Sequence, residues 1–86
     1  MKHAGPETLN GLERLLAKLR KNEVLTERKP GTFYLKSSAF LHFHEDPEGI
    51  FADLKIAGTF ERFRVSTRAE QAAFLRAVAA TLGASR

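Results

Sequence analysis

The chain contains no cysteine, and its 86 residues include no long apolar run. Without cysteine, a disulfide-stabilised secreted scaffold, a thiolate metal site and a cysteine nucleophile are all excluded. A membrane-spanning helix needs about 20 consecutive apolar residues, and a signal peptide needs a shorter apolar run near the start of the chain. We find neither pattern, so these absences predict a cytoplasmic protein without a membrane partner.

Internal repeats, low-complexity tracts and long linkers are also missing. A chain of this length has room for one small domain, and its 43% hydrophobic and 28% charged residues are typical of a globular protein. The net charge of +4 is concentrated in one stretch, because six bases and two acids lie between Arg14 and Lys29. A solvated helix face explains this stretch, and an acidic partner or nucleic acid is the alternative.

Two hydrophobic periods divide the chain. The leucines from Leu9 to Leu19 recur at spacings of three and four, which predicts an amphipathic helix. From Thr32 to Ser66 apolar and polar residues alternate, which predicts strands. Thr67 and Glu70 match a capping box before a second helix. The predicted elements are a flexible tail over 1–5, a helix over about 6–22, a charged connection over 23–31, strands over about 32–36, 39–45, 50–56 and 59–66, and a helix over about 67–82.

Both predicted helices need to bury an apolar stripe. We therefore predict an α+β fold, a two-layer sandwich in which both helices cover one face of a four-stranded antiparallel meander. The opposite side of the sheet is called the outer face below. Because residues directly opposite across an antiparallel pair point to the same side, the turns at 46–49 and 57–58 predict the register. The neighbours predicted on the outer face are His44 with Phe51 and Arg64, His42 with Asp53 and Arg62, and Phe40 with Lys55 and Phe60.

Clustered aromatic side chains among bases are unusual on a small monomer, so we expect another molecule to cover the outer face. Interface centres are enriched in aromatics and arginine. We predict a binding module without enzymatic activity that forms a homodimer or binds an unlike protein. Nucleic acid is an alternative partner, and a further alternative is that a helix or the tails cover the face, which then has no role. The predicted partner-binding residues are Tyr34, Phe40, His42, His44, Phe51, Phe60, Arg62 and Arg64, with Phe40, Phe51 and Phe60 as anchors.

Two histidines one residue apart suggest a metal site on the same face. His42 and His44 project from one side of a strand about 6.5 Å apart at the backbone, which allows both imidazoles to bind one metal. With Asp53 opposite His42, this set suits zinc or non-haem iron. The simpler alternative is structural, in which Asp53 orients His42 and pairs with Arg62.

Other chemistry has weaker sequence support. A free amino terminus with His3 in third position can bind Cu(II) or Ni(II) in square-planar geometry. A hydrolase would need Ser37 or Ser38 as a nucleophile, and neither lies in a nucleophile-elbow pattern. The sequence therefore predicts no catalytic residue and, apart from the metal alternative, no cofactor.

Overall fold

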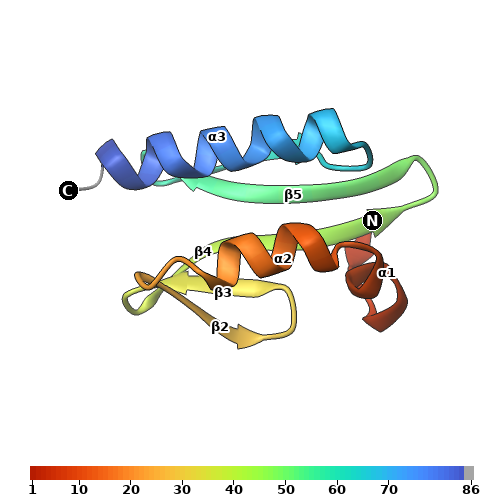
Figure 1. Cartoon of the computed structure of the whole chain (residues 1–86), viewed down its shortest axis with the longest axis horizontal. Helices are drawn as coiled ribbons and strands as arrows, with labels where there is room; N and C mark the ends of the chain where they lie inside the picture. Colours follow the sequence, from red (N-terminus) through yellow and green to blue (C-terminus); the bar gives the residue numbers. More distant parts are fainter. Residues whose placement is uncertain (85–86) are drawn as a thin grey trace.

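The computed structural model describes residues 1–84, which form a six-stranded antiparallel sheet with helices packed on one face (Figure 1). Five strands follow the order β2-β3-β4-β5-β6, and β1 pairs with β4 outside this path. This arrangement confirms the predicted α+β sandwich, with more strands than the four we expected. The elements are β1 (Lys2–His3), α1 (Pro6–Gly11), α2 (Glu13–Arg20), β2 (Leu25–Lys29), β3 (Thr32–Leu35), β4 (Ser38–Asp46), β5 (Gly49–Ile56), β6 (Thr59–Arg64) and α3 (Arg68–Ala84).

The helices bury their apolar stripes against one face of the sheet, with α2 and α3 lying side by side over it (Figure 1). The predicted first helix is divided at Leu12, whose backbone (φ −103°, ψ 16°) ends α1 and precedes α2. Leu12 is buried at this break and belongs to the core. The core comprises Leu9, Leu12, Leu15, Leu16 and Leu19 from the first two helices, Phe74, Val78 and Leu82 from α3, and Leu25, Phe33, Phe40, Leu41, Phe43, Ala52, Leu54 and Val65 from the strands and their ends.

The predicted capping box is present before α3. The Thr67 hydroxyl oxygen accepts a hydrogen bond from the Glu70 amide at 3.1 Å, and the Glu70 carboxylate accepts from the Thr67 and Ser66 amides at 2.9 Å each. These bonds satisfy amides that a helix start leaves without a partner.

Two strands lie where we predicted none. Residues 23–31, expected as a charged connection, contain β2, which buries Leu25 opposite Leu35. Residues 1–5, expected as a flexible tail, contain β1, in which His3 pairs with His44. β1 forms because β4 is longer than β3: β3 pairs with β4 only from Ser38 to His42, and β1 pairs with the part of the same edge that β3 leaves open. β2 forms on the other edge of β3.

The predicted register is confirmed for both hairpins. Glu45 pairs with Ile50 and His42 with Asp53, while Asp53 in turn pairs with Arg62. The two turns therefore set the register as their lengths predicted.

Phe40 corrects the prediction for the outer face. Phe33 pairs with Leu41 and Tyr34 with Ala39, so Phe40 is an extra residue in β4, at a bulge. The bulge changes the direction of the side chain, and Phe40 is only 3% exposed, within the core. The prediction that Phe40 anchors a partner is therefore wrong.

No helix within residues 1–84 is long and apolar enough to cross a membrane.

Candidate metal site on the outer face

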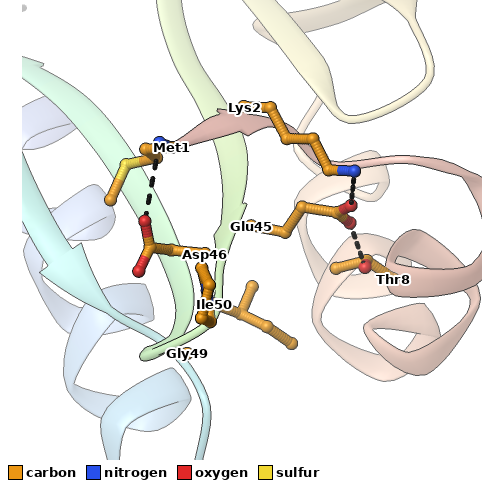
Figure 2. Close-up of a pocket in the computed structure, with 8 residues that line it drawn as sticks. Met1, Lys2, Thr8, Glu45, Asp46, Gly49 and Ile50 are labelled. Atoms are coloured by element: carbon orange, nitrogen blue, oxygen red, sulfur yellow. Dashed lines mark hydrogen bonds and ion pairs between the residues drawn. The ribbon is translucent and has the colours of Figure 1, made fainter.

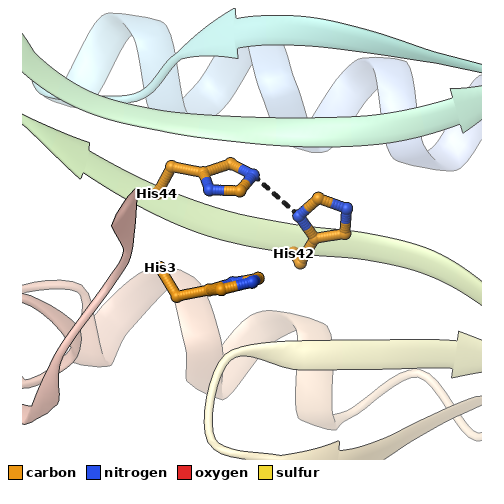
Figure 3. A group of neighbouring side chains, drawn as sticks. All are labelled: His3, His42 and His44. Atoms are coloured by element: carbon orange, nitrogen blue, oxygen red, sulfur yellow. Dashed lines mark hydrogen bonds between the residues drawn. The ribbon is translucent and has the colours of Figure 1, made fainter. Parts of the chain in front are cut away.

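Three histidine rings meet on the outer face, two from β4 and one from β1 (Figure 3). His42 and His44 alternate with core residues along β4, and the pairing of β1 with β4 brings His3 opposite His44. Each ring offers a nitrogen, and these three nitrogens lie within 4.8 Å of one another. The chain has only three histidines, so all of them belong to this group, which we call the histidine cluster.

Contacts within the histidine cluster are close. Nδ1 of His42 lies 2.9 Å from Nε2 of His44 (Figure 3). The ring of His3 lies 5.2 Å from that of His44 and 5.9 Å from that of His42, between centroids. The ring of Phe60 stands 4.9 Å from that of His42 and forms one wall of the cluster.

Asp53 and Arg62 support the cluster from β5 and β6. Asp53 is 7% exposed, and its carboxylate accepts from Nε and Nη2 of Arg62 at 2.8 and 3.0 Å. The same carboxylate lies 3.1 Å from Nε2 of His44. The predicted neighbours are confirmed, although the imidazole that contacts Asp53 is that of His44 and not that of His42.

These contacts affect the protonation of Asp53 and His42. The hydrogen bonds from Arg62 hold the pKa of Asp53 below its usual value, so the carboxylate is ionised and accepts only. Nε2 of His44 lies between this carboxylate and Nδ1 of His42, so it can donate a hydrogen bond to Asp53. Burial lowers the pKa of His42, and the neighbouring His44 adds to this effect. Neutral imidazoles are the form that binds metals.

The predicted partner-binding residues are only partly available. Phe60 is 40% exposed, and Arg62 and Arg64 are exposed beside it on β6. Tyr34 and Phe51 are half-buried. The aromatic part of the outer face is therefore smaller than the sequence predicted, since Phe40 is absent from it.

A cavity of about 340 Å³ lies next to the histidine cluster. It occupies the place where β1 ends and β3 begins, because both strands pair with the same edge of β4. The cavity is lined by His3, Ala4, Leu9, Lys29, Pro30, Gly31, Thr32, Tyr34, His42 and Phe43.

A second cavity, of about 560 Å³, lies at the other end of β1 (Figure 2). Its acids already have partners: Glu45 accepts from the Thr8 hydroxyl and pairs with Lys2 at 3.4 Å, and Asp46 pairs with the Met1 amino group at 3.5 Å. The hydrogen bond from Thr8 is the main reason why the pKa of Glu45 is lowered. These contacts hold the chain start and α1 against β4.

Sequence reasoning missed His3 as a member of the cluster. It assigned His3 to a separate amino-terminal site, because two polar residues at the chain start carry no strand pattern. The available signal was the length of the second predicted strand, 39–45, which exceeds that of the first, 32–36, and leaves part of its edge without a partner. None of the known protein families compared with the chain matches it, and no curated protein or solved structure does so either.

Proposed function

We propose that the chain binds one divalent transition metal, zinc in the first place, through His3, His42 and His44. The observation that supports this proposal is the approach of three imidazole nitrogens to within 4.8 Å of one another. Two nitrogens bound to one tetrahedral zinc at about 2.0–2.1 Å lie roughly 3.3 Å apart. Small side-chain movements are therefore enough to bring the three nitrogens around one ion.

Three imidazoles favour zinc over the non-haem iron that a carboxylate ligand would suit. The sequence predicted a set of His42, His44 and Asp53. Both carboxylate oxygens of Asp53, however, accept from Arg62. We therefore assign Asp53 to the positioning of His44 and His3 to the third ligand position, since a carboxylate that holds a ligand histidine is common around zinc.

The test is zinc binding by protein without a histidine tag, measured by titration calorimetry. We expect one zinc per chain, and each of the variants His3→Ala, His42→Ala and His44→Ala should weaken binding by more than the roughly 10–100-fold that loss of an outer-shell partner costs. Asp53→Asn should fall in that milder range. Thr26→Ala, a change elsewhere on the outer face, is the matched control and should bind zinc normally.

The same variants separate this site from the amino-terminal copper or nickel site. That alternative needs His3 and the backbone at the chain start, and it does not need β4. Loss of zinc binding in His42→Ala therefore supports the histidine cluster. If His42→Ala and His44→Ala bind as well as the unchanged protein, the proposal is wrong.

Partner binding is a second proposal, supported by the exposed ring of Phe60 beside two exposed arginines. A homodimer or an unlike protein seated on the outer face would cover Phe60. Nucleic acid has less support, because Arg62 pairs with Asp53 and Arg64 donates to the Glu48 carbonyl at 3.1 Å. A cytoplasmic location and the lack of enzymatic activity stay predictions.

A further inference from the structure

The cavity beside the histidine cluster has two chemically different sides. Its wall on the outer face includes two of the proposed metal ligands, His3 and His42. Its interior side includes Leu9 and Phe43, which belong to the core. A molecule in this cavity would therefore contact the metal site at one end and apolar side chains at the other.

Lys29 adds a positive charge to this cavity. It lies in β2 next to the turn at Pro30, lines the cavity and is exposed, and it makes no ion pair with any residue in the range 1–84. The hydroxyl-bearing residues Thr32 and Tyr34 line the same space. No acidic side chain of residues 1–84 lines it, so a bound metal and Lys29 would give this cavity a positive potential.

Three protein ligands leave the fourth position of a tetrahedral zinc for water or another ligand. We infer that a small monocarboxylate with a short apolar body occupies this position, with its carboxylate on the metal and its hydrocarbon part against Leu9 and Phe43. This inference rests on the proposed metal site. The volume of about 340 Å³ is at the lower end of the range for ligand cavities, and it accommodates a carboxylate with a short hydrocarbon chain.

Cobalt provides the readout, because the visible absorption of Co(II) depends on the ligands around the ion. The protein loaded with Co(II) is titrated with butyrate, and the spectrum is recorded at each step. We expect a saturable change in the visible bands. Butyramide has nearly the same shape without the charge, and it should cause no change.

Lys29→Met tests the contribution of the cavity, and Lys18→Met, which removes another exposed charge, from α2, is the control. Lys29→Met should weaken butyrate binding about threefold to fivefold, as expected for one exposed charge pair, while Co(II) binding stays unchanged. Lys18→Met should change neither.

The outcomes separate the two proposals. If Co(II) does not bind, the metal site itself is wrong. If Co(II) binds and butyrate leaves the spectrum unchanged, the metal site stands and the carboxylate inference is overturned. Equal effects of Lys29→Met and Lys18→Met on butyrate binding would show that the cavity contributes nothing, and would also overturn the carboxylate inference.

Discussion

Gly31 and Gly58 adopt the same backbone region in different surroundings. Their φ angles are +78° and +84°, in the left-handed region that side chains with a Cβ rarely adopt. A Cβ on Gly31 would lie 2.7 Å from Cδ2 of Leu9, which is buried in the core. A Cβ on Gly58 would meet no atom within 4 Å. A residue with a Cβ would therefore have a strained backbone at either position, but only at position 31 would it also contact the core.

Alanine at each position should separate these two effects. We expect Gly58→Ala to lower the free energy of unfolding by about 1 kcal/mol, through backbone strain alone. Gly31→Ala should cost roughly 1–3 kcal/mol more, because Leu9 must move within a packed core. Urea denaturation of the three proteins measures the difference. Equal costs at both positions would contradict the proposed contact with Leu9.

Single residues show where sequence reasoning reached its limit. The alternation along β4 correctly placed His42 and His44 away from the core. The same alternation placed Phe40 on the outer face, because a bulge one residue away has no signature in the pattern. The position of His3 depends on pairing between distant segments, which a local pattern does not contain.

At the scale of elements, Glu27 connects α2, β2 and the turn that follows β2. Its carboxylate accepts from Nε of Arg20 at 2.6 Å, from Nη2 of Arg20 at 3.1 Å and from the amide of Gly31 at 2.9 Å. The hydrogen bonds from Arg20 are the main reason why the pKa of Glu27 is lowered. A carboxylate with a lowered pKa stabilises the fold above its unfolded pKa, and this contribution is lost as the pH falls through the folded pKa.

Glu27→Gln should therefore destabilise the chain more at pH 7 than at pH 3. We expect a loss of about 1 kcal/mol at pH 7, the usual contribution of such hydrogen bonds. The loss should be smaller at pH 3, because this pH lies below the ordinary pKa of glutamate and the contribution of the ionised form decreases there. Thermal unfolding at both pH values measures this difference. Glu23→Gln removes an exposed acid from the preceding connection and is the matched control. A loss of the same size at pH 3 would rule out the ionised form as the cause.

The strands at the two ends of the path β2-β3-β4-β5-β6 carry charges that oppose pairing between sheets. β2 contains Glu27, Arg28 and Lys29, and β6 contains Arg62 and Arg64. Charged side chains on edge strands prevent the addition of a further strand. If two copies associate, the outer face is therefore the more suitable surface.

The elements with a strong period or turn signal were predictable, namely the leucine helix, the two hairpins and the capped α3. β2 was not, because only Leu25 of its five residues is buried and the rest of the strand reads as a charged loop. β1 was not either, since two residues cannot show a period. Both strands depend on an edge that exists only once their neighbours have folded.

At the scale of the whole molecule, we expect two copies of the chain to associate through the outer face. A stable interface buries about 800 Å² on each partner. This is a small part of the accessible surface of 5511 Å² of this chain, so one face is large enough to form it. We expect a dimer at tens of micromolar, measured by light scattering after size exclusion, and Phe60→Ser should shift it to the monomer. Val24→Ser removes an apolar side chain that is 54% exposed in the α2–β2 connection and should leave the dimer intact. A monomeric unchanged protein at this concentration contradicts the proposal.

The pairing of β1 with β4 gives the metal site a second consequence. His3 and His42 are about 40 positions apart, so one ion bound to both would close a loop of this length in the folded chain only. A disulfide closes such a loop in the unfolded chain as well, and this chain has no cysteine with which to form one. A metal link opens whenever the ion leaves, and its contribution to the free energy of unfolding grows with the logarithm of the free metal concentration. The stability of this fold would then depend on the metal supply of its surroundings.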